Sequence, residues 1–260
     1  MTPLVCIAGD DLDHPLRFQL GKYKGTCFTR SGPGGYHQNQ DAVGVYRGVA
    51  NTLVMAVADG LGGMPDGAGA ARRVIESFEG TAEPLASIVG CIQSANDAML
   101  TDSFPGGCTL IVAECFGGRL VVHHVGDAGG VIVSNAGSIR MQTVAHSPVG
   151  QAQAHEGLEE ALALAHPQRH VVSNMVGSDD MWVETSDAME LINGDTAIIA
   201  SDGLWDNFFL HEVVDMIIEE DLMSAASNLI DQATARMIAP NASIPSKEDD
   251  LSFILFRHVG

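Results

Sequence analysis

Three short apolar segments of this chain each end in an aspartate beside a glycine, and this repeated ending restricts the fold. The segments are LVMAVADG, LVVHHVGD and TAIIASDG, which end at Asp59-Gly60, Gly126-Asp127 and Asp202-Gly203. A carboxylate at the end of a buried strand is costly unless it has a partner, and glycine lets the backbone turn sharply beside it. We therefore expect several strands to end together at one polar site.

Further acidic residues flank other apolar segments. Asp249-Asp250 comes directly before the last strand-like segment, and Asp41 precedes the apolar stretch AVGVY. A single Asp-Gly pair is equally well an ordinary turn, so the argument depends on the repetition. Carboxylates gathered at one end of a sheet repel one another unless cations neutralise them, and an all-oxygen site suits Mg²⁺ or Mn²⁺.

The order of the segments favours antiparallel sheets. The strand-like segments are short and bounded by Gly, Asn or Asp, whereas longer segments carry helical periodicity. A hairpin over residues 109–125 with its turn at 116–119 indicates antiparallel pairing. Because strands and helices do not alternate regularly, we expect a layered α/β (α+β) architecture and not a doubly wound parallel sheet. Strands are expected at 52–58, 109–115, 120–125, 131–134, 196–200 and 251–257, and helices at 68–78, 83–100, 156–165, 211–218 and 221–238.

Composition excludes several classes of function. The chain has 33 acidic and 13 basic residues and a formal charge of -20, which argues against binding nucleic acid or an anionic membrane. A hydrophobic fraction of 46% without a linker or repeat favours one domain over residues 1–260. An N-terminus that has no basic start and turns acidic after nine residues, the lack of a membrane-length apolar run and five irregularly spaced cysteines predict a cytoplasmic protein with reduced thiols.

The motifs, in their order along the chain, resemble those of a known family. They are similar to the motifs of PP2C-type (PPM) metal-dependent protein serine/threonine phosphatases. Leu61 stands where many eukaryotic members have a histidine, so the likeness is to the bacterial-type subclass. The motifs are Asn39-Gln40-Asp41-Ala42, Ala58-Asp59-Gly60-Leu61-Gly62-Gly63, Gly107-Cys108-Thr109, Val125-Gly126-Asp127, Gly194-Asp195, Ser201-Asp202-Gly203-Leu204-Trp205-Asp206 and Asp249-Asp250-Leu251-Ser252.

The resemblance implies a four-layer α-β-β-α sandwich with a metal centre between two antiparallel sheets. It implies two Mn²⁺ or Mg²⁺ ions, bridged by Asp59, with the Gly60 carbonyl on one of them. Asp202 and Asp249 would complete the ligand shell of the second ion. Asp127 with Asp202 would match a third metal site found in bacterial-type members. Asp59 and Asp202 are then the catalytic candidates. Three further residues are expected just outside the ligands: Asp41, Thr109 and Asp250.

The implied reaction is direct hydrolysis of phosphoserine and phosphothreonine in proteins by a metal-activated water. No GxSxG elbow, Cys-x5-Arg loop or HExxH helix points to other hydrolytic chemistry. The implied partners are phosphoprotein substrates, with a cognate Ser/Thr kinase system as a further candidate.

One departure from the family pattern concerns the substrate phosphate. Members usually carry an arginine three residues before the asparagine of the first motif, and Tyr36 stands there in this chain. Tyrosine brings neither the charge nor the bidentate geometry of arginine. Arg30 and His37 are alternative phosphate-binding candidates, although Arg30 is equally well an ordinary surface residue. The departure leaves open a catalytically weak PP2C-like regulatory or phosphopeptide-binding domain.

Two other features point less clearly to function. Asp11-x-Asp13 is typical of haloacid-dehalogenase-like phosphatases, but His14 follows where glycine or threonine is expected. His123 and His124 are neighbours on a predicted strand, so they face opposite sides and cannot both bind one metal. We expect both to be packed or hydrogen-bonded histidines.

Overall fold

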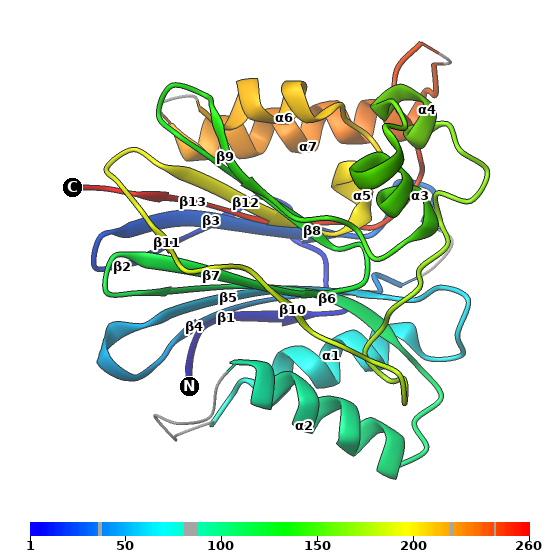
Figure 1. The fold of residues 1–260 in the computed structure, drawn as a ribbon, viewed down its shortest axis with the longest axis horizontal. Helices are drawn as coiled ribbons and strands as arrows, with labels where there is room; N and C mark the ends of the chain where they lie inside the picture. Colours follow the sequence, from blue (N-terminus) through cyan, green and yellow to red (C-terminus); the bar gives the residue numbers. More distant parts are fainter. Residues whose placement is uncertain (36–37, 81–87, 219–220, 242) are drawn as a thin grey trace.

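The computed structural model describes residues 1–35, 38–80, 88–218, 221–241 and 243–260. Two antiparallel sheets face each other, and a pair of helices covers the outer face of each sheet (Figure 1). This arrangement confirms the predicted α-β-β-α sandwich.

The first sheet has seven strands in the order β1-β4-β5-β6-β7-β10, with β11 also paired to β7. The predicted hairpin is confirmed, because β6 and β7 pair in antiparallel register from Leu110 opposite Val125 to Phe116 opposite Arg119. The strands are β1 (Thr2–Ala8), β4 (Asp41–Arg47), β5 (Leu53–Gly60), β6 (Cys108–Phe116), β7 (Arg119–Val125), β10 (Glu184–Thr185) and β11 (Met189–Glu190).

The second sheet has six strands in the order β2-β3-β13-β12-β8-β9. The chain passes from the first sheet to the second directly between β7 and β8. The strands are β2 (Leu16–Leu20), β3 (Tyr23–Arg30), β8 (Gly129–Val133), β9 (Ile139–Gln142), β12 (Thr196–Ala200) and β13 (Leu251–His258).

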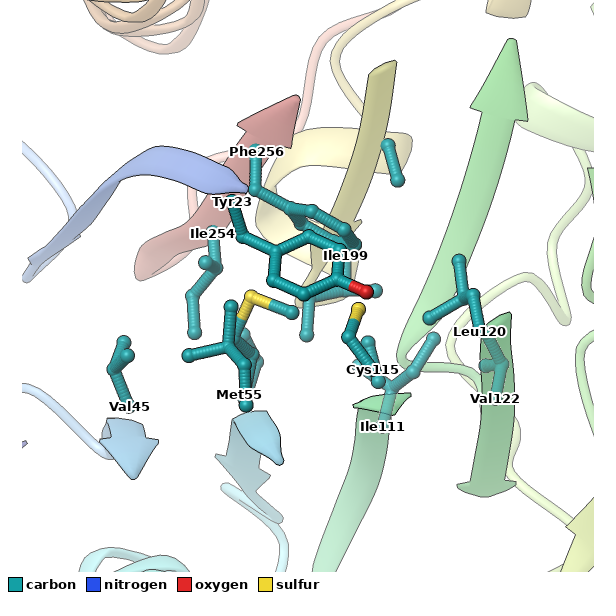
Figure 2. Packing of buried hydrophobic residues seen from close by; sticks show 14 of the residues in the cluster. Tyr23, Val45, Met55, Ile111, Cys115, Leu120, Val122, Ile199, Ile254 and Phe256 are labelled. Atoms are coloured by element: carbon teal, nitrogen blue, oxygen red, sulfur yellow. The ribbon is translucent and has the colours of Figure 1, made fainter. Parts of the chain in front are cut away.

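The central core lies between the sheets, where side chains of both inner faces pack together (Figure 2). Strand β5 is apolar along nearly its whole length because both of its faces are buried. Met55 and Val57 point into the central core, whereas Ala56 and Ala58 pack beneath the helices on the outer face. Because side chains alternate across a strand, burial of both faces gives a nearly continuous apolar segment. Figure 2 labels Val45, Met55, Ile111, Cys115, Leu120 and Val122 opposite Tyr23, Ile199, Ile254 and Phe256.

Helices α1 (Gly67–Ser77) and α2 (Ile88–Thr101) cover the first sheet, and α6 (Leu210–Ile217) and α7 (Leu222–Ile238) cover the second (Figure 1). Two of these helices begin with an aspartate cap. Asp66 accepts a hydrogen bond from the Gly69 N–H, and Asp221 accepts one from the Ser224 N–H. Such caps satisfy donors that the first helical turn leaves free.

The segment between β9 and β10 differs from the prediction. The helix expected at 156–165 is divided, because Gly157 adopts a left-handed conformation with φ of 74° between two short helices. Residues 83–87 of the predicted helix 83–100 lie outside the described residues. The remaining short helices are η1 (Val49–Asn51), α3 (Pro148–Gln151), η2 (Ala152–Glu156), α4 (Glu160–Leu164) and α5 (Asp202–Trp205). Within the described chain, no helix combines the length and apolar character that a membrane span requires.

Candidate metal centre

Two of the predicted carboxylates stand side by side at one end of the first sheet. Asp41 begins β4 and is directly opposite Asp59, which is in turn opposite Thr109 near the start of β6. The antiparallel register thus produces a row of three polar residues across neighbouring strands. Asp41 and Thr109 are buried.

The second sheet brings its carboxylates to the same end. Strand β12 ends at Ala200, and α5 begins at Asp202 two residues later. Strand β13 begins at Leu251, directly after Asp249 and Asp250. Because β12 and β13 are antiparallel, the end of one lies beside the start of the other. Asp127 follows β7 and precedes β8, where the chain crosses between the sheets.

Hydrogen bonds link the two sheets at this end. The Ser201 hydroxyl donates to Asp41 Oδ2 at 2.8 Å, and it accepts from the Ser252 N–H at 3.2 Å. The Ser252 hydroxyl donates to Thr29 Oγ1 at 2.7 Å. Since Asp41 belongs to the first sheet and the other three residues to the second or its ends, these bonds join the layers beneath the carboxylates.

Asp250 positions the loop that follows β3. Its Oδ1 accepts from the Gly32 N–H at 2.9 Å, and its Oδ2 accepts from the Gln40 N–H at 2.7 Å. Both carboxylate oxygens are therefore engaged with backbone donors. Tyr36 and His37, two of the predicted phosphate-binding candidates, belong to this loop but lie outside the described residues.

Arg30, the third phosphate-binding candidate, makes contacts with neighbouring backbone. Its Nε and Nη2 donate to the Leu12 carbonyl at 3.1 and 3.0 Å, and Nη2 donates to the Asp13 carbonyl at 2.9 Å. The guanidinium also lies 4.9 Å from the centre of the Phe28 ring. These contacts favour a structural role for Arg30.

The carboxylates influence one another strongly. Burial raises the pKa of Asp59 well above its usual range, and the charges of Asp41, Asp202, Asp249 and Asp127 raise it further. Burial, followed by the charge of Asp202, also raises the pKa of Asp127 to about 8 and that of Asp249 to about 6. Mutual repulsion of this kind is relieved when a cation binds between the groups.

The donor set fits a hard divalent cation. Asp59, Asp127, Asp202 and Asp249 offer only carboxylate oxygens, which Mg²⁺ and Mn²⁺ prefer. Glycine is required at Gly203 for α5 to lie against the start of β13, because a Cβ there would come 1.8 Å from the Asp250 carbonyl oxygen.

Lys247 lies among these carboxylates, and sequence reasoning did not assign it to the site. Its Nζ is 3.0 Å from Asp206 Oδ2 and 2.9 Å from Asp249 Oδ2, and it also contacts Asp202. Burial acts to lower the pKa of Lys247, but the three carboxylates raise that pKa above its ordinary value. Asp206 is four residues after Asp202, which places both side chains on one face of a helical turn.

A cavity of about 490 Å³ opens beside the carboxylates. Asp127, Asp202 and Asp206 line one side of it, and Val149 and Gly150 of α3 line another. Helices α3, α4 and α5 gather at this end of the sandwich (Figure 1). A substrate group entering the cavity would therefore reach the carboxylates directly.

A separate group of side chains, His124, His146 and Glu184, also has the composition of a metal site. Within the described chain it is the one set of at least three His, Cys, Asp or Glu residues whose candidate ligand atoms all lie within 4.8 Å of one another. His146 Nδ1 accepts from the Gly126 N–H at 3.1 Å and from Asn174 Nδ2 at 2.8 Å. The proton of neutral His146 is therefore on Nε2, which lies 3.1 Å from Glu184.

The hydrogen bonds of this histidine group favour a structural role. His124 Nε2 lies 3.0 Å from the Val144 carbonyl, so that nitrogen donates. A metal ligand needs a free nitrogen lone pair, and the bonds of His146 leave none on the nitrogen that faces Glu184. His123 instead contacts Thr185, with its Nδ1 3.0 Å from Thr185 Oγ1. These contacts agree with the expectation of packed and hydrogen-bonded histidines.

Known phosphatases resemble this chain in sequence. No protein-family model matches the chain. The serine/threonine phosphatase stp of Listeria welshimeri is 22% identical over 238 residues, which cover 84% of this chain and 90% of that protein. The corresponding protein of Listeria monocytogenes serotype 4b is 25% identical over 184 residues, or 65% of this chain and 73% of that protein.

Solved structures share the fold over nearly the whole chain. Serine/threonine phosphatase Stp1 from Staphylococcus aureus superposes with a TM-score of 0.78 and 22% identity, covering 96% of this chain and 100% of that one. The catalytic domain of the phosphatase PstP, in complex with two manganese ions, gives a TM-score of 0.70 and 22% identity, covering 92% and 99%. This chain therefore has the fold of bacterial serine/threonine phosphatases, and its sequence is similar to theirs at 22–25% identity.

Proposed function

We propose that this protein is a metal-dependent serine/threonine protein phosphatase, with residues 1–260 forming one phosphatase domain. The observation that carries the proposal is the convergence of Asp59, Asp127, Asp202 and Asp249 at one end of the sandwich. These residues come from four separate segments, and their mutual repulsion is the kind that a multi-cation site relieves. The relatives described above bear the same activity in their names.

The roles of the proposed site residues follow from their positions. Asp59 lies opposite Asp41 at the sheet end and would hold two Mn²⁺ or Mg²⁺ ions, with the Gly60 carbonyl beside it. Asp202 and Asp249 would hold the second ion, and Asp127 with Asp202 a third. Bound cations of this type supply a nucleophilic water at neutral pH and neutralise the phosphoryl oxygens. Asp59 and Asp202 are therefore the proposed catalytic residues.

The surrounding residues would keep this set in place. Ser201 holds Asp41 through its hydrogen bond, and Asp250 holds the backbone of Gly32 and of Gln40. Thr109 lies opposite Asp59 on the neighbouring strand β6. The cavity beside Asp127 would admit a phosphorylated side chain of a protein substrate, and a cognate Ser/Thr kinase would supply such substrates.

The alternative, a catalytically weak domain that binds phosphopeptides, requires the same fold. It is less well supported, because such a domain has no evident need for several mutually repelling carboxylates at one point. The two functions differ in turnover, so one assay separates them.

The test is Mn²⁺-dependent hydrolysis of p-nitrophenyl phosphate and of a phosphothreonine peptide. We expect the wild type to be active with Mn²⁺ or Mg²⁺ and inactive after EDTA treatment. Asp59→Asn and Asp202→Asn should each remove activity while the protein stays folded. Asp215→Asn on the exposed face of α6 is the matched control and should retain full activity.

Two results would contradict the proposal. A wild-type protein that binds Mn²⁺ but turns over neither substrate would favour the phosphopeptide-binding alternative. An active Asp202→Asn variant would show that the assigned carboxylates do not form the reactive centre.

A further inference from the structure

The ammonium group of Lys247 contacts three carboxylates at the proposed metal centre. Nζ lies 2.9 Å from Asp249 Oδ2 and 3.0 Å from Asp206 Oδ2, and it also donates to Asp202 Oδ2. Asp202 and Asp249 belong to the proposed ligand set, whereas Asp206 does not. The chain therefore places a positive charge of its own on oxygen atoms that a divalent cation would use.

Hydrogen bonds to a buried asparagine hold the backbone of Lys247 at this position. Its N–H donates to Asn207 Oδ1 at 3.0 Å, and its carbonyl accepts from Asn207 Nδ2 at 2.8 Å. Asn207 is fully buried, and its Nδ2 also donates to the Gly203 carbonyl at 2.9 Å. Arg236 in turn donates to the Asn207 carbonyl at 2.6 Å. The fold thus fixes the origin of the lysine side chain within reach of the carboxylates.

An ammonium and a divalent cation compete for these oxygen atoms. Two positive charges a few ångströms apart repel each other, and the repulsion is strong where water is largely excluded. Only 20% of the Lys247 side chain is exposed, so solvent screens the charges weakly. A cation that binds the same oxygen atoms of Asp202 and Asp249 would repel the ammonium, and Asp206 would remain as its acceptor.

We propose, building on the phosphatase function above, that Lys247 is a tethered counter-cation that competes with the divalent cation for Asp202 and Asp249. When the cation binds, the ammonium keeps only its contact with Asp206. Two consequences follow for the protein. Lys247 offsets the repulsion between the carboxylates before a cation arrives, and it lowers the affinity of one metal position.

The test uses the full chain, freed of metal with EDTA and titrated with MnCl₂ by calorimetry. We expect Lys247→Met and Lys247→Gln to bind Mn²⁺ about tenfold more tightly at one position than the wild type, because the competing charge is gone. Lys24→Met is the matched control, since it removes the same charge from an exposed position of β3, at the opposite end of that strand from Arg30. Its Mn²⁺ affinity should match that of the wild type.

Thermal unfolding gives a second readout that does not depend on activity. Without Mn²⁺, the two Lys247 variants should unfold at lower temperature than Lys24→Met, and the rise in Tm on adding Mn²⁺ should be larger. If either variant folds poorly, Asp206→Asn provides another test. That variant keeps every proposed ligand but removes the remaining acceptor for the ammonium, so Mn²⁺ affinity should fall.

The outcomes separate this inference from the proposed function. If the wild type binds Mn²⁺ and the Lys247 variants bind it no more tightly, Lys247 is not a competitor and only the inference is overturned. If the wild type binds no Mn²⁺, the metal-dependent function fails and the inference fails with it.

Discussion

Ser201 and Asp41 are separated by 160 positions in the sequence, and a 2.8 Å hydrogen bond joins the serine hydroxyl to the aspartate Oδ2. Asp41 starts a strand of the first sheet, whereas Ser201 follows a strand of the second. Both residues are buried. This contact closes the polar end of the sandwich beneath the proposed metal ligands.

Replacing Ser201 with alanine should therefore destabilise the protein. The change leaves buried Asp41 without the hydroxyl donor, and an unsatisfied buried polar group costs about 1–3 kcal/mol. Urea unfolding should show a loss of that size for Ser201→Ala. Ser243→Ala, at an exposed position, is the control and should leave the free energy of unfolding unchanged. Equal stability of the two variants would show that the bond between the sheets contributes nothing.

Gly203→Ala should disturb the centre through backbone contact alone. A Cβ at Gly203 would lie 1.8 Å from the Asp250 carbonyl oxygen, so α5 and the start of β13 must move apart. Asp202 and Asp249 flank this contact, and we expect both weaker Mn²⁺ binding by calorimetry and a lower Tm. Gly63→Ala is the control for stability, since a Cβ there meets no atom within 4 Å. Unchanged Mn²⁺ affinity in a folded Gly203→Ala variant would argue against close packing of the two ligand segments.

His124 should make stability depend on pH. Burial lowers the pKa of His124 below the ordinary value of 6.5, and nearby His146 and His123 lower it further. The hydrogen bond to the Val144 carbonyl and the charge of Glu184 raise this pKa but do not offset the lowering. The unfolded chain therefore binds a proton at higher pH than the folded protein does. The stabilising contribution is present above about pH 6.5 and is lost as the pH falls towards the folded pKa.

The measurement is urea unfolding at pH 7.5 and pH 5.5. Wild-type protein should lose more free energy of unfolding between these values than His124→Gln, which has no imidazole to protonate. His155→Gln, at an exposed position, should behave like the wild type. The same loss in His124→Gln as in the wild type would assign the pH dependence to other groups.

The secondary structure was predictable for part of the chain, because strands β1, β3 and β4 are not among the predicted strands although each has seven or eight residues. The predicted strand at 196–200 has the bounds of β12, and the predicted helix at 221–238 differs from α7 by one residue at its start. Strands β10 and β11 have two residues each, too few for alternation to be recognised. Their pairing with β7 depends on contacts that local sequence does not contain.

The ligand candidates were recognisable because each sits at the end of an apolar segment, and the family resemblance supplied the layer order that local patterns do not. Lys247 was not recognisable as part of the site. It is 45 positions from Asp202 in the sequence, and nothing in its immediate neighbourhood differs from an exposed charged segment. Only the packing of Asn207 against the backbone at position 247 brings its ammonium to the carboxylates.

The amino-acid sequence by itself determined many of the strands and helices, because side-chain periodicity and turn residues act over a few positions, but it did not predict strands such as β3 and β4. It also determined that aspartates stand at the strand ends. Only the tertiary structure decided which of those ends meet, because the antiparallel register and the facing of the sheets involve residues far apart in the chain. The hydrogen bond from Ser201 to Asp41 and the ion pairs of Lys247 belong to that second level.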